Sequence, residues 1–161
     1  MKEKLVLVGN GMAGVRTLEE LLKISPDMYD ITVFGDEPHG NYNRILLSPV
    51  LAGEKKIDGI MLNEEQWYEE NGIKLHTGKA VVKIDRRNRA VIAEDGTTEN
   101  YDRLLLATGS NSIILPLPGN DLHGVVTFRN IRDVQTMLEI SEPHKQALII
   151  GGGLLGLEAA Y

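Results

Sequence analysis

Three glycines near the start of the chain have the spacing of a phosphate-binding turn. Gly9, Gly11 and Gly14 form a G-x-G-x-x-G pattern directly after the apolar run Leu5–Val8. In this setting the first glycine makes a tight turn, the second lets a pyrophosphate approach the backbone, and the third allows close helix packing. Free N–H groups at the start of the following helix would face the phosphates. The pattern therefore predicts a nucleotide site formed by Gly9, Asn10, Gly11, Met12, Ala13 and Gly14.

An acidic pair follows at the distance expected of a ribose ligand. Asp36 lies about 20 residues beyond Gly14, after a second apolar run, Ile31–Phe34. We expect Asp36 to bind ribose hydroxyls, with Glu37 as a nearly equal candidate, and a solvated acidic turn is the alternative. Arg44 could reach a phosphate in bidentate fashion, although a surface arginine is the plainer interpretation of that residue alone.

The same glycine spacing returns close to the end of the sequence. Gly151, Gly153 and Gly156 follow the apolar run Ala147–Ile150. Two such turns in one chain most simply bind two dinucleotides. The sequence stops at Tyr161, about two turns into the second helix, so we expect a fragment of a longer protein. A terminal strand and helix that bind nothing are the alternative for this second pattern.

The stretches that must position these residues alternate between strand and helix patterns. Apolar spacing, glycine turns and caps predict the elements, and the short strands from residue 81 to 101 predict an antiparallel meander inserted in a parallel sheet. The first predictions in chain order are a helix from Gly14 to Ile24, a helix capped by Asn63 and ended by Asn71-Gly72, and strands at 73–75, 81–84, 90–93 and 97–101. After them we expect a buried strand at 104–106, a short strand from 125, a helix over 130–140 and a strand at 147–150.

Composition limits the classes of partner. The 161 residues are 42% hydrophobic and 25% charged, as in globular domains, and the net charge of −6 argues against nucleic acid or an anionic membrane. The sequence has no cysteine, which excludes a disulfide, a thiolate metal site or a cysteine nucleophile in these residues and suits a reducing, cytoplasmic compartment. We expect no metal site, because His39, His76, His123 and His144 lack ligand spacing.

The two glycine patterns, with Ala107-Thr108-Gly109 between them, resemble the FAD-dependent pyridine nucleotide oxidoreductases. The runs 35–39 and 42–48 are similar to the ferredoxin/rubredoxin reductase branch, and within it to the N-terminal flavin module of NAD(P)H nitrite reductase large subunits. The resemblance implies an α/β, Rossmann-like three-layer fold with a parallel sheet and an antiparallel meander. Residues 1–115 would be the first segment of an FAD-binding domain, and residues 116–161 the truncated start of an NAD(P)-binding domain.

The resemblance also implies roles for the residues of the FAD site. Residues 9–14 would hold the pyrophosphate, and Asp36 and Glu37 would bind the adenosine ribose. Arg44 would lie along the cofactor, and Val82 would contact the adenine through its backbone.

The remaining roles concern the flavin ring and the nicotinamide nucleotide. The run Ala107-Thr108-Gly109 would flank the flavin, while Gly151, Gly153 and Gly156 would hold NAD(P)H and Glu158 would lie near the nicotinamide. The sequence departs from many ferredoxin reductases by having Pro49 where they carry a lysine.

The function implied by the resemblance is electron transfer from NAD(P)H through FAD to an iron–sulfur/sirohaem domain or a rubredoxin- or ferredoxin-type acceptor. The cofactors carry this chemistry, so no catalytic side chain is expected. A stand-alone NAD(P)H:rubredoxin or ferredoxin reductase is one alternative, and a nucleotide-binding module without turnover is another. A four-cysteine region downstream would distinguish the nitrite reductase from the stand-alone enzyme.

Overall fold

The structure, a computed structural model, describes residues 2–141 and 146–160. Its chain contacts define two units. The first comprises Met1–Tyr42 and Met61–Gly109, and the second comprises Asn43–Ile60 and Ser110–Tyr161.

Four parallel strands form the centre of the first unit. Their order is β5 (Lys74–His76), β2 (Tyr29–Phe34), β1 (Glu3–Val8) and β9 (Arg103–Leu106), and each neighbouring pair is parallel. Helix α1 (Met12–Ile24) connects β1 to β2, as parallel neighbours require a crossover. The predicted strand–helix–strand unit and the third parallel strand are confirmed.

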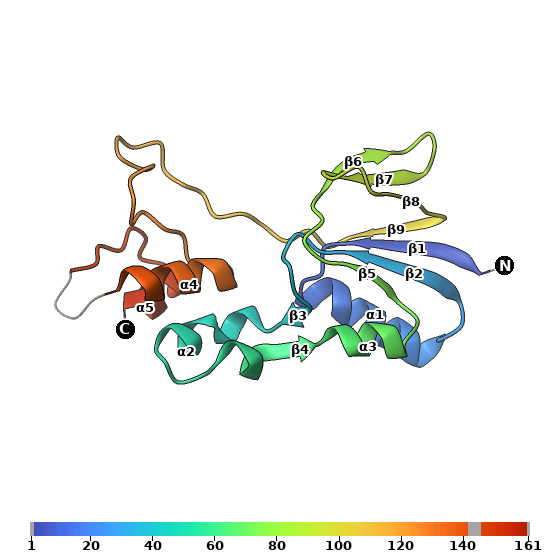
Figure 1. Ribbon diagram of the computed structural model, residues 1–161, viewed down its shortest axis with the longest axis horizontal. Helices are drawn as coiled ribbons and strands as arrows, with labels where there is room; N and C mark the ends of the chain where they lie inside the picture. The colour runs from blue at the N-terminus through green and yellow to red at the C-terminus, as the bar shows by residue number, and fades with distance from the viewer. Residues whose placement is uncertain (1, 142–145, 161) are drawn as a thin grey trace. The chain divides into compact units, whose positions relative to one another are not determined.

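The two faces of this sheet are covered by different layers (Figure 1). Helices α1 and α3 (Glu65–Glu70) lie over one face, where their apolar residues share a core with the sheet. The buried members of that core are Leu5, Leu7, Leu18, Ile31, Val33, Tyr68 and Ile73. Because successive strand residues point to opposite faces, alternate residues of β1 enter a second core. That core contains Val6, Val8, Phe34, Val91 and Ala93.

The second core lies under the predicted meander, whose antiparallel strands are β6 (Val81–Asp85), β7 (Ala90–Ala93) and β8 (Thr98–Asn100). A turn containing Asp95-Gly96 joins β7 to β8, with Gly96 at φ +85°. The meander forms a sheet of its own, following β5 and preceding β9 in the chain. The expected three-layer fold, with a parallel sheet and an antiparallel meander, is confirmed. A short ribbon of β3 (Asn41–Tyr42) and β4 (Met61–Asn63) completes the first unit.

The second unit is built from helices in the residues that the structure describes. Helix α2 (Leu47–Leu51) packs against α4 (Ile131–Ile140) and α5 (Leu154–Ala160). Two 3-10 turns, η1 (Arg44–Leu46) and η2 (Ile57–Ile60), flank α2 in the chain. The buried residues of this unit include Leu47, Val50, Ile60, Ile131 and Val134. The predicted helix over residues 130–140 is confirmed, with Asn130 as its cap.

Four predicted elements differ from the structure. Asn63 is not a helix cap, because it ends β4, pairs with Asn41 there, and leaves the cap of α3 to Glu64. Residues 125–126 and 147–150 are not strands, since within the described residues neither run pairs with another strand, and Leu148 is 87% exposed. Strand β9 forms as predicted but is not fully buried, because it is the edge of its sheet and Leu106 is 55% exposed.

Candidate dinucleotide-binding site

The first glycine loop has the backbone that its sequence pattern predicts. Gly9 has φ +110°, a region that side chains rarely adopt, and a Cβ there would lie 2.2 Å from the carbonyl oxygen of Ala107. A Cβ on Gly14 would lie 2.8 Å from the Gly9 oxygen and 3.0 Å from Leu7 Cδ1. Both positions therefore exclude a side chain, because helix α1 and strands β1 and β9 meet there.

Gly11 differs from these two glycines, because the space beside it is open. An added Cβ would meet nothing within 4 Å, and the residue has φ −85° and ψ 174°, which any residue can adopt. Gly11 is the N-cap of α1, and neither a capping side chain nor an acidic first-turn residue satisfies the helix start. The first-turn N–H groups beside an open cradle fit an anionic group such as a pyrophosphate.

The two ribose-ligand candidates lie in the loop after β2, which the main chain holds on both sides. Asp36 is exposed, whereas Glu37 is half-buried and accepts a hydrogen bond of 2.8 Å from the Tyr42 hydroxyl. His39 Nε2 lies 3.5 Å from the same Glu37 oxygen. The structure therefore gives Glu37 a defined orientation through Tyr42. Two backbone hydrogen bonds hold this loop in place. The Gly78 N–H donates to the Glu37 carbonyl oxygen at 2.9 Å, and the Lys79 N–H donates to the Gly35 carbonyl oxygen at 2.8 Å.

A buried polar network that the sequence reasoning missed surrounds Asn10, inside the glycine loop. The Tyr68 hydroxyl donates to Asn10 Oδ1 at 2.7 Å, and Asn41 Nδ2 donates to the Asn10 carbonyl oxygen at 3.0 Å. Tyr68 is 1% exposed and Asn41 is 2% exposed. Burial raises the pKa of Tyr68 to about 12, against the hydrogen bond to Asn10, which lowers it. The sequence alone indicates only that an aromatic residue in this helix packs in the core. It contains no signal for the hydrogen-bond partner of the Tyr68 hydroxyl.

Val82 and the run after β9 also have distinct environments. Val82 is 65% exposed, and the register between β6 and β7 shifts between Val81 and Lys83, which places Val82 at a bulge. Because a bulged residue is left out of the ladder, Val82 has no directly paired residue on β7. Ala107 packs beside Gly9 and Gly14, while Thr108 and Gly109 are exposed, with Gly109 at φ +72°.

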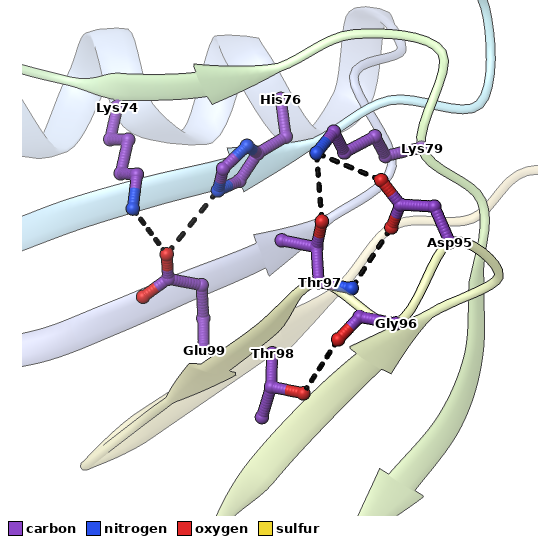
Figure 2. A network of polar contacts seen from close by, with 8 residues as sticks. All are labelled: Lys74, His76, Lys79, Asp95, Gly96, Thr97, Thr98 and Glu99. Carbon is purple, nitrogen blue, oxygen red and sulfur yellow. Dashed lines mark hydrogen bonds and ion pairs between the residues drawn. The ribbon is translucent and has the colours of Figure 1, made fainter.

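Two charged clusters connect the meander to the edge strand β5 and to the connection after it (Figure 2). Glu99 on β8 contacts Lys74 and, at 3.3 Å, His76 Nε2. Burial raises the pKa of Glu99, but hydrogen bonds and charge from Lys74 and His76 outweigh burial and hold that pKa below its usual value. His76 also stacks on Phe34 with ring centroids 4.7 Å apart. This cluster thus couples β8 of the meander to β5 of the parallel sheet.

The second cluster lies beside the backbone that fastens the Glu37 loop. Lys79 Nζ donates to Thr97 Oγ1 at 2.7 Å and pairs with Asp95 at 2.9 Å. Hydrogen bonds from the Thr97 N–H and from Lys79 hold the pKa of Asp95 well below its usual value. Because the Lys79 backbone N–H also bonds Gly35, the meander supports the loop that carries Glu37.

The second glycine loop, in the second unit, shares with the first a positive φ at its first glycine, open space at its second and a close contact at its third. It differs at the first glycine, because an added Cβ on Gly151 would meet nothing within 4 Å, unlike one on Gly9. Gly151 has φ +128°, and a Cβ on Gly156 would lie 1.9 Å from the Gly151 oxygen. Gly153 has nothing within 4 Å of an added Cβ. The first helical bond matches as well, from the Leu157 N–H to the Gly153 oxygen at 3.0 Å, as from Val15 to Gly11 in the first loop at 3.1 Å.

Two other predicted residues have polar contacts within the second unit. Arg44 Nη1 donates to the Arg129 carbonyl oxygen at 2.9 Å, and Ser48 Oγ donates to Glu158 Oε2 at 2.6 Å. The assignments of Arg44 to FAD and of Glu158 to the nicotinamide stay predictions.

The histidines differ in their surroundings. His39 and His76 lie beside carboxylates, His123 is exposed, and His144 lies outside the described residues. Over residues 2–141 and 146–160, no three His, Asp or Glu side chains gather into a group that could hold a metal. Over the same ranges, every helix is too short or too polar to cross a membrane.

Comparison with known proteins identifies the family. Residues 3–161 match the sequence model of the pyridine nucleotide-disulphide oxidoreductases, and the chain belongs to that family. It is 57% identical over 159 residues to a nitrite reductase [NAD(P)H] of Bacillus subtilis (strain 168), which covers 99% of this chain and 20% of that protein. It is 36% identical to the ferredoxin–NAD(+) reductase subunit of a benzene 1,2-dioxygenase system of Pseudomonas putida, over 99% of this chain and 39% of that one.

Solved structures agree with this assignment. The NADH:rubredoxin oxidoreductase of Clostridium acetobutylicum superimposes with a TM-score of 0.87 at 30% identity, covering 99% of this chain and 41% of that one. The chain thus spans from 20% to 41% of the length of these relatives. Although the family name refers to disulphide chemistry, this sequence has no cysteine and so holds no redox dithiol.

Proposed function

We propose that this chain is the nucleotide-binding part of an FAD-dependent NAD(P)H oxidoreductase. The complete protein would pass electrons to an iron–sulfur/sirohaem acceptor, as in an NAD(P)H nitrite reductase large subunit. The observation that supports this most directly is the recurrence of these shared loop features at two glycine patterns, in a chain 57% identical to a nitrite reductase [NAD(P)H].

The residues of the first loop fit the pyrophosphate of FAD. Gly11 leaves open the space that a Cβ would fill, and the uncapped start of α1 offers N–H groups to phosphate oxygens. Glu37, oriented by Tyr42, would accept hydrogen bonds from the ribose hydroxyls, which favours it over the exposed Asp36. The bulge at Val82 would present backbone groups to the adenine.

In this proposal the cofactor and the protein have separate roles. Bound FAD would supply hydride acceptance from NAD(P)H and release of single electrons. The chain's own residues bind and orient the nucleotides, through the first loop for FAD and through Gly151, Gly153 and Gly156 for NAD(P)H. Because no proton transfer to a side chain is needed for these roles, we assign no catalytic acid or base.

A valine at Gly11 tests the assignment of the first loop. Gly11→Val should fold, because its backbone is extended and an added Cβ meets nothing within 4 Å, yet the side chain should occupy the position of the pyrophosphate. Gly59→Val is the matched control, since Gly59 also has open space around an added Cβ and lies outside both loops. Flavin content per chain is measured by absorbance in the complete natural protein.

We expect Gly11→Val to lose FAD and Gly59→Val to keep it. If the Gly11→Val protein still held one FAD per chain, the assignment of this loop to FAD would be refuted.

A stand-alone ferredoxin or rubredoxin reductase is the second candidate, favoured by the structural match to the NADH:rubredoxin oxidoreductase. The acceptor distinguishes the two in the complete protein. Oxidation of NAD(P)H that depends on nitrite supports the first, whereas reduction of rubredoxin or ferredoxin without any response to nitrite supports the second.

A further inference from the structure

The buried hydroxyl of Tyr68 has its hydrogen-bond partner in the glycine loop rather than in the core around it. It donates to Asn10 Oδ1 at 2.7 Å, and Asn10 lies between the first two glycines of the phosphate-binding loop. We propose that Tyr68, Asn10 and Asn41, here called the clamp, set the position of that loop relative to Glu37. This inference rests on the proposed function, because it concerns how the same site holds FAD.

The clamp fixes the glycine loop by both its side chain and its backbone. Tyr68 holds the Asn10 side chain, and Asn41 Nδ2 holds the Asn10 carbonyl oxygen at 3.0 Å. Asn10 Nδ2 in turn lies 3.5 Å from the His39 carbonyl oxygen. A buried polar group is costly when unpaired, so these groups favour the one loop position that satisfies them together.

The neighbour of Asn41 reaches the ribose-ligand candidate. Asn41 and Tyr42 form strand β3; the side chain of Asn41 bonds the glycine loop, and the Tyr42 hydroxyl bonds Glu37 at 2.8 Å. The two ligand-bearing loops are therefore connected through one dipeptide. Their close packing adds to this, because a Cβ on Gly35 would lie 2.9 Å from Asn10 Cβ.

The hydroxyl of Tyr68 is well suited to this positioning role. Burial raises the pKa of Tyr68 to about 12, so the hydroxyl keeps its proton and acts as a donor at neutral pH. The ring is anchored in the core beneath β1 and β2, where Trp67 packs edge-on against it with centroids 5.0 Å apart. The donor thus belongs to a rigid element, while its acceptor belongs to the ligand loop.

A positioning role predicts that Tyr68 and Glu37 depend on each other in binding FAD. If Tyr68 aligns the glycine loop with Glu37, loss of its hydroxyl weakens the bond from Glu37 to the ribose. That penalty should shrink once Glu37 has already been replaced. A hydroxyl that only stabilises the core would instead change FAD affinity by the same factor in either background.

The experiment measures the dissociation constant of FAD in the complete natural protein, stripped of cofactor, by flavin fluorescence. Tyr68→Phe is made alone and together with Glu37→Gln. Tyr29→Phe is the matched control, because it removes a tyrosine hydroxyl at the amino end of β2 against the same core. We expect Tyr68→Phe to weaken FAD binding about fivefold, the effect of one net hydrogen bond, and to do so by less than twofold in the Glu37→Gln background.

Two results would overturn the clamp. In the first, Tyr68→Phe raises the FAD dissociation constant by the same factor with and without Glu37→Gln. In the second, Tyr68→Phe raises that constant no more than Tyr29→Phe does. If Tyr68→Phe does not fold, Asn10→Ala removes the same bond from the loop side, and the comparison of backgrounds is unchanged. The Gly11→Val variant separates this inference from the proposed function. Retention of FAD by Gly11→Val rejects the site itself, whereas loss of FAD in Gly11→Val with equal factors for Tyr68→Phe rejects the clamp alone.

Discussion

Alanine at Gly14 and alanine at Gly11 should affect stability differently, although the two residues are three apart in one loop. At Gly14 the new Cβ would lie 2.8 Å from the Gly9 carbonyl oxygen, 3.0 Å from Leu7 Cδ1 and 3.1 Å from Ala107 Cβ. The nearest of these atoms is backbone, in a turn held at φ +110°, and cannot move as a flexible side chain would. At Gly11 the same atom would meet nothing within 4 Å.

The magnitudes follow from opposing terms at each position. In helix α1, replacing glycine by alanine gains about 1 kcal/mol of helix propensity, but overpacking of a tight contact costs roughly 1–3 kcal/mol. Gly14→Ala should therefore lower the free energy of unfolding by about 1 kcal/mol. At the N-cap, replacing Gly11 by alanine reduces the conformational freedom of the unfolded chain, which stabilises the folded state by about 0.4–1 kcal/mol. Alanine is a poorer N-cap than glycine by a similar amount, so the two effects nearly cancel. Gly11→Ala should change stability by less than about 0.5 kcal/mol.

Urea unfolding of the 161-residue chain without nucleotide checks both values. Trp67 is the only tryptophan in the sequence and packs against the core of the first unit, so its fluorescence follows this unit. We expect the midpoint of Gly14→Ala to fall and that of Gly11→Ala to stay near the parent. If Gly14→Ala were as stable as the parent or more so, helix propensity would dominate and the tight contact would not explain the glycine.

Two further predictions concern charge and capping. The folded pKa of Glu99 is held below 4.5, so its contribution to stability is full above about that pH and is lost as the pH falls through the folded value. Glu99→Gln should therefore show a shallower loss of unfolding free energy in acid than the parent, and parallel acid limbs would contradict the role of its contacts with Lys74 and His76. Asn130 caps α4 by accepting the Asp133 N–H at 2.9 Å, so Asn130→Ala should destabilise this helix by about 1 kcal/mol, whereas Asn130→Ser should not. Hydrogen exchange of α4 amides measures this, and equal exchange in both variants would contradict it.

Local patterns predicted much of the first unit. The apolar runs and glycine spacing around residues 5–14 predicted a strand, a turn and a helix, because each requirement involves only neighbouring backbone. Asn71-Gly72 ends α3 with Gly72 at φ +64°, and Asp95-Gly96 turns the meander, as their preference for left-handed backbone indicates.

Predictions that depended on distant partners succeeded less often. Asn63 has the residue type of a helix cap, but pairing with Asn41 places it in a strand, and no local pattern contains that partner. The run 147–150 has strand composition, yet a strand needs a hydrogen-bonded neighbour, which it lacks in the residues described. Leu104–Leu106 was expected to be buried because it is apolar, whereas its position at the edge of the sheet leaves Leu106 exposed.

The sequence by itself determined where the predicted phosphate-binding loop lies, because the absence of a Cβ at Gly9, Gly11 and Gly14 is a property of residue type and spacing. Only the tertiary structure distinguished the glycines that a fold requires from the one that leaves space for a ligand, since that depends on what β9 and α1 bring near each. The tertiary structure also decided that Tyr68 bonds Asn10 and that Tyr42 orients Glu37. Residue type alone specifies neither bond, because Tyr68 and Asn10 are 58 residues apart and Tyr42 reaches Glu37 across a loop and strand β3.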